Sequence, residues 1–436
     1  MSEEIKNVQE ELNEQMQIRR DKLAEYEADG IYPFGQRFVV KDNAKEIKDD
    51  FFLKYDGQPV VIAGRLMTIR SHGKTAFANV RDKSGDIQVY FRKDVLGEEA
   101  YKYVKMLDIG DIIGVEGHVF KTHTGEVTIK VNKLTLLSKS LRPLPEKWHG
   151  LKDTELRYRQ RYVDLIVNPE VRDTFVKRSQ IVAKIREYMM RDGFMEVETP
   201  MMHAIPGGAA ARPFITHHNA LDIDIYMRIA PELYLKRLIV GGMDRVFEMN
   251  RCFRNEGIDN RHNPEFTTIE SYQAYGDVED AIRLTENLVS YCAQEVLGTQ
   301  EITYQGTEIN LTPPWNRITM AEGVKKYTGE DFDAVTTVEE ARAIADRLNV
   351  EYTDNDGIGK ILNACFEDYV EENLIQPTIV YGHPKEISPL AKASRENPLA
   401  TERFEAFIYG RELANGFSEL NDPIDQKQRF LDQLKE

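Results

Sequence analysis

FRNEGIDNRHNPEFTTIE, residues 253–270, is a charged loop that runs into a segment of strand-like sequence. DRVFEMNRCF (244–253) precedes the loop, EFTTIESYQAY (265–275) ends it, and both segments have the composition of β-strands. We therefore expect two strands joined by this loop, with Arg254 directly after the first strand. In the returning strand, alternation places Phe266 and every second residue after it on one face.

The side chains of this loop suit an oligophosphate ligand. Arg254 at a strand end, with Arg261 and His262 nearby, could stabilise charge on a reacting phosphorus. The ring of Phe266 offers a surface on which a purine could stack. A hairpin with a salt-bridged loop explains the same string, and the spacing alone does not separate the two interpretations.

The sequence around this loop predicts an α+β domain. Residues 171–193 have a helical pattern and run into FMEVETP, a short strand that ends at Pro200. FEAFIYG (404–410) and LANGFSEL (413–420) have the pattern of a second hairpin. We expect helices around a largely antiparallel sheet.

The N-terminal part has a different pattern. An amphipathic helix is expected over residues 4–29, and a linker with two prolines over 141–150. Between them, a helical piece at 97–107 follows the third of five expected strands, as an OB-fold barrel requires. The five strands are 59–70, 75–82, 86–92, 111–120 and 125–137. Another small β-barrel would fit the same strand count.

Composition limits the class of protein. The chain has 436 residues with 41% hydrophobic and 30% charged residues, no long apolar run and no secretory signal pattern. Its three cysteines are far apart, which favours a reducing compartment, and we expect a cytoplasmic protein. The net charge is −16, but residues 51–150 hold 16 basic and 11 acidic side chains. This segment could face a polyanion, although an ordinary solvated surface has the same composition.

The loop resembles the second signature motif of class II aminoacyl-tRNA synthetases. The motif has the form found in the lysyl enzymes and not the form of the aspartyl or asparaginyl enzymes, with RNEG, then RHNPEFT and a glutamate after it. KSLRPLPEKWHGL, RYRQRYVDLI, HPKEISPLAK and ELANGFSEL also match the lysyl pattern, in order along the chain. The helix and strand ending at Pro200 resemble the first motif, which in this family forms the interface of a homodimer.

The resemblance implies a domain organisation and a reaction. Residues 1–50 would be an N-terminal helical extension, 51–140 an OB-fold anticodon-binding domain, 141–170 a linker and 171–436 a class II catalytic domain. The enzyme would ligate lysine to tRNA(Lys) through a lysyl-adenylate, with ATP as substrate and Mg²⁺ as cofactor. No membrane or DNA partner is expected.

The resemblance also implies roles for individual residues. Arg254 would hold the α-phosphate and the lysine carboxylate, with help from Asn415, and would be the catalytic residue. The ATP-binding set would be completed by Phe266 under adenine, Glu256 and Asn263 near its edge, and Arg261 and His262 near the outer phosphates.

Gly208 and Glu232 would bind the α-amino group of lysine. Glu270, Tyr272, Phe417 and Glu419 would form the side-chain pocket, and Glu405 and Glu412 would hold the metal. Arg70, Phe77 and Gln88 would read the anticodon.

Residue chemistry agrees with a lysine pocket. Alternation in NGFSE places Asn415, Phe417 and Glu419 on one strand face, which supplies an amide, a ring and a carboxylate for a cationic side chain. Taken singly, Phe417 has the character of a core residue, and Glu405 and Glu412 that of surface glutamates. Phe77 could equally be a core ring of the barrel, because alternation does not tell which face points inward.

We find no third motif, the glycine-rich helix start of G-x-G-x-D-R type. The chain would then be a truncated catalytic domain, with little lysine activation on its own, or a non-catalytic synthetase-like RNA-binding protein; the intact lysine pocket favours truncation. A lysine ligase acting on a protein acceptor is the other alternative. Relatives of that kind resemble the catalytic domain alone, so residues 1–140 argue against it.

Overall fold

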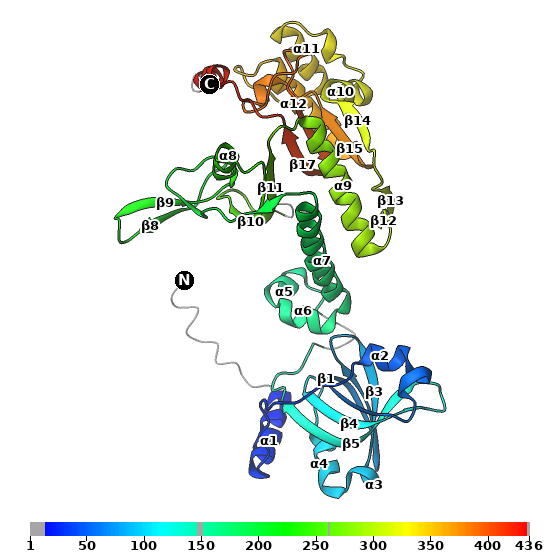
Figure 1. The fold of residues 1–436 in the computed structure, drawn as a ribbon. Helices are drawn as coiled ribbons and strands as arrows, with labels where there is room; N and C mark the ends of the chain where they lie inside the picture. The colour runs from blue at the N-terminus through cyan, green and yellow to red at the C-terminus, as the bar shows by residue number, and fades with distance from the viewer. Residues whose placement is uncertain (1–13, 146–150, 260–261, 434–436) are drawn as a thin grey trace. The chain divides into compact units, whose positions relative to one another are not determined.

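The computed structural model describes residues 14–145, 151–259 and 262–433. The chain divides into two compact units, Met1–Arg172 and Asp173–Glu436 (Figure 1). Each unit is described below by itself. Within the described residues, we find no helix that combines the length and the apolar character needed to cross a membrane.

The first unit contains a closed five-stranded barrel with the strand order β1-β2-β3-β5-β4. Its strands are β1 (Pro59–His72), β2 (Thr75–Arg81), β3 (Asp86–Arg92), β4 (Ile112–Lys121) and β5 (Val127–Ser138). Strict alternation buries every second residue of β2 and β3, so that Ala76, Val80, Val89 and Phe91 fill the barrel. The predicted OB-fold is confirmed, including the helix α4 (Glu98–Met106) between the third and fourth strands.

The first unit also contains short helices. They are α1 (Glu14–Ala28), α2 (Ala44–Asp49), η1 (Phe51–Tyr55), α3 (Lys93–Leu96), α5 (Thr154–Arg159) and α6 (Arg161–Val167). α1 is held by Arg19, whose guanidinium donates to the carbonyl oxygens of Ser140 at 3.0 Å and Ile109 at 3.1 Å. The first ten residues of the helix expected over 4–29, and residues 146–150 of the expected linker, lie outside the described residues.

The second unit is built around two sheets. The first has the order β11-β10-β6, and the second has the order β14-β15-β16-β17. Their strands are β6 (Met195–Glu196), β10 (Arg245–Phe253), β11 (Glu265–Gln273), β14 (Asn316–Thr319), β15 (Thr378–Tyr381), β16 (Arg403–Phe407) and β17 (Glu412–Phe417). Both expected hairpins, β10–β11 and β16–β17, are antiparallel, whereas β6–β10 and β14–β15 are parallel pairs.

Small sheets and helices complete this unit. α7 (Pro169–Arg191) begins at the end of the first unit, and α9 (Val278–Leu297) packs on the four-stranded sheet through Ile282, Ile379, Phe404 and Ala406 (Figure 1). The other elements are β7 (Met202–His203), β8 (Ile215–His218), β9 (Ile223–Met227), α8 (Glu232–Val240), β12 (Glu301–Tyr304), β13 (Thr307–Asn310), α10 (Met320–Thr328), η2 (Phe332–Ala334), α11 (Val338–Leu348), α12 (Ile358–Tyr369), η3 (Glu371–Asn373), η4 (Lys385–Ile387) and α13 (Pro423–Gln433).

Candidate active site

The hairpin β10–β11 brings Arg254 and Phe266 together. Cys252 pairs with Phe266 in the strand register, and the backbone N–H of Arg254 donates to the carbonyl of Pro264 at 2.8 Å. The Arg254 guanidinium carbon lies 5.2 Å from the centre of the Phe266 ring. Nε of Arg254 is buried and lacks a hydrogen-bond partner among the described residues, so its N–H is available to donate to an anionic ligand.

The turn after Arg254 packs against the segment that contains Gly208. The backbone N–H of Asn255 donates to the carbonyl of Arg212 at 2.7 Å, and Oε1 of Glu256 accepts from the N–H of Arg212 at 3.2 Å. His262 is exposed and lies 2.7 Å from Asp259 through Nδ1. Asn263 is also exposed, and Arg261 lies outside the described residues.

A cation site lies between α8 and the segment after β17. Nζ of Lys236 is 2.7 Å from Oε1 of Glu232 and 2.8 Å from Oε2 of Glu419. The same ammonium lies 5.8 Å from the ring centre of Tyr272 and 5.9 Å from that of Phe417. The structure therefore gathers four of the residues predicted to bind lysine around one ammonium group.

Gly208 lies directly beside Glu232. A Cβ atom on Gly208 would be only 2.8 Å from Cβ of Glu232, and the φ of Gly208 is +92°. Both the close approach and the left-handed backbone require glycine at this position. The two residues predicted to bind the α-amino group are thus neighbours, although they are 24 positions apart in the sequence.

Glu270 and Tyr272 share one face of β11, as alternation predicts. The Tyr272 hydroxyl donates to Oε1 of Glu270 at 2.7 Å. Burial, assisted by the charges of Glu232 and Glu419, raises the pKa of Glu270 to about 7. Burial also raises the pKa of Glu419. The pocket holds carboxylates that are costly to ionise without a cation beside them.

Glu405 and Glu412 lie on the neighbouring strands β16 and β17. Oε1 of Glu405 is 2.5 Å from a guanidinium nitrogen of Arg403, and Oε2 is 3.4 Å from Nε2 of His383. Burial acts to raise the pKa of Glu405, but His383 and Arg403 hold it below its ordinary value. The pKa of Glu412 is raised, first by partial removal from water and then by repulsion from Glu405.

Both carboxylates lie on paired strands, with Glu405 opposite Asn415 and Glu412 opposite Phe407 in the register. A group of three or more His, Cys, Asp or Glu side chains that could hold a metal is absent from residues 14–145, 151–259 and 262–433. Two carboxylates with phosphate oxygens and water would still form an ordinary environment for Mg²⁺. Asn415, which pairs with Glu405 in the register, accepts a hydrogen bond from Nε of Arg403 at 3.1 Å.

In the first unit, the predicted anticodon residues lie on the outside of the barrel. Phe77 is half-buried between Ala76 and Ala78, which point inward, and its ring stacks on Tyr90 with centroids 4.3 Å apart. Arg70 is exposed and pairs with Phe77 in the register. Oε1 of Gln88 accepts from the Thr128 hydroxyl at 2.8 Å. The possibility that Phe77 belongs to the barrel core is thereby excluded.

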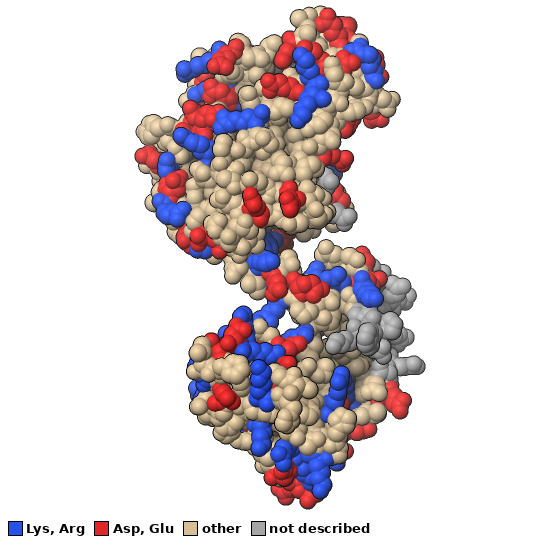
Figure 2. All heavy atoms as spheres, turned by 90° about the vertical axis from the view of Figure 1, so that its right-hand side faces the viewer, with Lys and Arg blue, Asp and Glu red and all other residues tan. Residues whose placement is uncertain are grey.

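The basic character of residues 51–150 is partly neutralised by neighbouring acids. This unit is drawn in the lower part of Figure 2, where Lys and Arg side chains lie beside Asp and Glu side chains on the visible face. Lys133 pairs with Glu116 at 2.8 Å, and Arg81 pairs with Asp86 at 2.5 Å. An RNA partner would therefore be recognised through particular side chains more than through a strong overall field.

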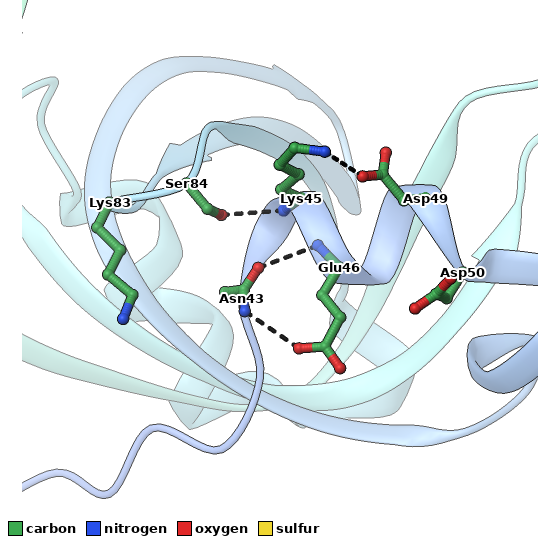
Figure 3. Close-up of a pocket in the computed structure, with 7 residues that line it drawn as sticks. All are labelled: Asn43, Lys45, Glu46, Asp49, Asp50, Lys83 and Ser84. Atoms are coloured by element: carbon green, nitrogen blue, oxygen red, sulfur yellow. Dashed lines mark hydrogen bonds and ion pairs between the residues drawn. The ribbon is translucent and has the colours of Figure 1, made fainter. Parts of the chain in front are cut away.

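The open pocket in Figure 3 is separate from all the predicted site residues. It lies between α2 and the turn of Lys83 and Ser84, and several of its polar groups already bind each other. The Lys45 N–H donates to the Ser84 hydroxyl at 2.9 Å, and the Glu46 N–H donates to Oδ1 of Asn43 at 3.0 Å. We assign no function to this pocket.

Sequence reasoning missed Lys236, Arg403 and His383. Lys236 follows Glu232 by four positions on α8, a spacing at which the two side chains meet, so the helical pattern contained a usable signal. Arg403 lies two positions before Glu405 on β16, on the same face. His383 carries no such local signal, because it reaches Glu405 only through the fold.

Comparisons with known proteins identify the class. A family model described as "tRNA synthetases class II (D, K and N)" matches residues 153–436, and one described as "OB-fold nucleic acid binding domain" matches residues 60–137. The chain belongs to the class II aminoacyl-tRNA synthetases.

The similar curated proteins show which amino acid this branch of the class uses. A lysine–tRNA ligase of Thermoanaerobacter pseudethanolicus is 58% identical over 436 residues, which cover 100% of this chain and 87% of the relative. One from Carboxydothermus hydrogenoformans is 59% identical over 426 residues (98% and 87%), and one from Bacillus subtilis is 55% identical over 442 (100% and 88%). The chain belongs to the class II lysine–tRNA ligases, enzymes that use ATP to join lysine to tRNA. A non-catalytic RNA-binding role is not favoured by these relatives.

Proposed function

We propose that the second unit activates L-lysine with ATP at the site formed by α8, β10, β11, β16 and β17, and that the activated lysine then passes to tRNA(Lys). The observation that carries this proposal is the position of the Lys236 ammonium group. It is held by Glu232 and Glu419 beside the rings of Tyr272 and Phe417, so these groups can surround a cation. Lysine would place its side-chain ammonium at Glu419, Glu270 and Tyr272 along Phe417, and its α-ammonium at Glu232 and the backbone of Gly208.

Arg254 would orient the reacting groups. Its buried, unpaired Nε favours a role in binding the lysine carboxylate and the α-phosphate, with Asn415 beside the carboxylate. A carboxylate oxygen of lysine attacks the α-phosphorus in line, the bond from phosphorus to the bridging oxygen breaks, and pyrophosphate leaves with that electron pair. No enzyme nucleophile is required, because positioning and charge stabilisation supply the catalysis.

The remaining nucleotide contacts follow from the hairpin. Phe266 would stack on adenine, Glu256 and Asn263 would lie near the edge of the base, and Arg261 and His262 would face the outer phosphates. The exposure of His262 suits a group that meets a ligand at the rim of the site. When ATP binds, the contact between His262 and Asp259 would either break or hold the imidazole in position for the phosphate.

ATP-dependent ligation implies a divalent metal, and we propose Mg²⁺ held by Glu405 and Glu412. The position of these carboxylates on paired strands and the raised pKa of Glu412 support a site that gains stability from a cation. When bound, the ion would neutralise phosphate charge. Arg403, which now binds Glu405, would share that carboxylate with the ion or release it.

For the tRNA, we propose that Arg70, Phe77 and Gln88 contact unpaired anticodon bases. Phe77 offers its half-buried ring for stacking, and the amide nitrogen of Gln88 can donate to a base edge while its oxygen accepts from Thr128. Tyr90, which stacks on Phe77, would support that ring. Arg70 would contact the backbone or a base beside it.

We also propose a cytoplasmic homodimer. Cys252, Cys292 and Cys365 are free and buried, which suits a reducing compartment. Phe175, Val176 and Ile181 of α7 are each at least 39% exposed, and a second copy of this helix could cover them. Sedimentation of the purified protein measures the oligomeric state.

The direct test of the lysine assignment is Glu419→Gln, measured by calorimetry with lysine and with ATP separately. Loss of the charged contact should weaken lysine binding at least tenfold and leave ATP binding within about twofold. Glu396→Gln, in an exposed loop, is the matched control and should change neither affinity. Equal losses for both ligands would mean that Glu419 is a metal or structural residue.

A further inference from the structure

The ammonium in the candidate lysine pocket belongs to the protein itself. Lys236 contacts Glu232 and Glu419 at 2.7 and 2.8 Å and lies under 6 Å from the rings of Tyr272 and Phe417. Four groups that the proposed function assigns to the substrate therefore surround a side chain of α8. A substrate ammonium at Glu419 and the ammonium of Lys236 would compete for the same carboxylate.

We propose that Lys236 is a resident cation that occupies the lysine pocket of the empty enzyme, and that substrate lysine displaces it. The exchange makes Lys236 a specificity-determining residue, because only an amino acid that brings its own side-chain cation can replace it at Glu419. This inference rests on the proposed function, since it takes the pocket to be the lysine site.

The pocket needs a cation when substrate is absent. The Glu232 side chain is only 10% exposed, and Glu419 and Glu270 are partly withdrawn from water in the same pocket. Carboxylates gathered in this way repel each other and are poorly solvated. Lys236 offsets both effects and keeps Glu232 and Glu419 in place for the ligand.

Lys236 can leave without a change of fold. It is in the second turn of α8, its side chain is 28% exposed, and its charge sits at the end of four flexible methylene groups. A rotation of this stem toward solvent frees Glu419 and leaves the helix, and Glu232 at its first position, where they are. The displacement is a side-chain movement only.

Charge matching then explains selection. Lysine offers two ammonium groups, one for Glu232 and one for Glu419, and so replaces both contacts of Lys236. Norleucine, which has the same side-chain carbons without the ammonium, offers only one. Its binding would either leave Lys236 in the way of its side chain or leave Glu419 without a cation.

The first test needs no variant. The wild-type protein is labelled with a trace amount of an amine-acetylating reagent, with and without saturating lysine, and the modified peptides are quantified by mass spectrometry. Labelling of Lys236 is divided by that of exposed Lys326 on α10 in the same sample. This ratio corrects for the reagent that free lysine consumes.

We expect the Lys236 ratio to rise at least threefold with lysine and to stay unchanged with norleucine. The reason is that burial lowers the pKa of Lys236 but the charges of Glu419 and Glu232 outweigh it and hold that pKa above its ordinary value, so displacement away from both carboxylates returns the amine to a more reactive state. A ratio that falls or does not change while lysine is bound would overturn the proposal, because a fixed structural lysine is shielded by ligand.

The second test compares Lys236→Met with Arg237→Met, which removes the same charge from the next, exposed position of α8. Without a resident competitor, Lys236→Met should bind lysine at least threefold more tightly, and Arg237→Met should match the wild type. Unchanged or weaker binding by folded Lys236→Met would assign Lys236 a scaffold role and overturn the proposal. Failure of Glu419→Gln to weaken lysine selectively would instead overturn the proposed function.

Discussion

Oε2 of Glu419 lies 2.8 Å from Nζ of Lys236. The carboxylate that the sequence motif assigns to the substrate's side-chain ammonium is therefore able to bind an ammonium at hydrogen-bond distance in this fold. The contact joins α8 to the segment after β17, two parts of the chain 183 positions apart. The proposed lysine selectivity would depend on this long-range approach, and the following predictions concern the groups around it.

Gly208→Ala should weaken lysine binding at least tenfold. The added Cβ would lie 2.8 Å from Cβ of Glu232 and would push that carboxylate away from the α-ammonium. Gly242→Ala is the matched control, because Gly242 has the same φ of +92° and nothing within 4 Å of its Cβ position. Isothermal titration with lysine measures both. Equal losses in the two variants would show that backbone strain, and not contact with Glu232, causes the effect.

Lysine affinity should depend on pH through Glu270. Burial raises the pKa of Glu270 to about 7 although the Lys236 ammonium is nearby, and substrate lysine, which would bring two ammonium groups in place of that one, favours the ionised carboxylate and lowers the pKa. Below pH 7, lysine binding must therefore release a proton, so the affinity falls as the pH falls. For this one group we expect binding about tenfold weaker at pH 6 than at pH 8.

Glu270→Gln provides the control for this pH effect. The variant has no titratable group at position 270, so its lysine affinity should lose the step near pH 7. Titration calorimetry from pH 5.5 to pH 8 gives both profiles. A flat wild-type profile, or a step that survives in Glu270→Gln, would show that Glu270 does not contact the ligand.

Phe77→Ala should weaken tRNA binding about tenfold, by loss of base stacking, with little effect on the stability of the barrel. Phe91→Ala is the contrasting variant, because Phe91 is 0% exposed in the barrel core and its truncation should cost about 3–5 kcal/mol of unfolding free energy. Filter binding with tRNA(Lys) and denaturant unfolding measure the two effects. A Phe77→Ala protein as unstable as Phe91→Ala would contradict a binding role.

Much of the fold was predictable because local patterns dominate it. β2 and β3 follow period-two burial strictly, and the predicted bounds of the five barrel strands and of β11 differ from the structure by only a few residues. The face of Phe77 was not predictable, since alternation defines two faces without saying which one closes the barrel. The structure settles this through the buried Ala76 and Ala78.

The helical layer between β14 and β15 was not assigned from the sequence, although it carries local signals. Thr319 with Glu322, and Thr337 with Glu340, form capping boxes at the starts of α10 and α11.

The site residues that the motifs did not identify are those that contact other side chains of the site. Arg403 binds Glu405, His383 lies 3.4 Å from it, and Lys236 binds Glu232 and Glu419. His383 and Glu405 meet only because β15 and β16 pair, which no local spacing expresses. Predictions of this kind need the register of the sheet as well as the motif.

A crystal structure of the protein with L-lysine bound would test the assignment of the lysine site most directly. The account predicts the side-chain ammonium within hydrogen-bond distance of Glu419, the α-ammonium beside Glu232 and Gly208, and the carboxylate facing Arg254. Lysine bound in the reverse orientation, or bound away from Glu419, would contradict it.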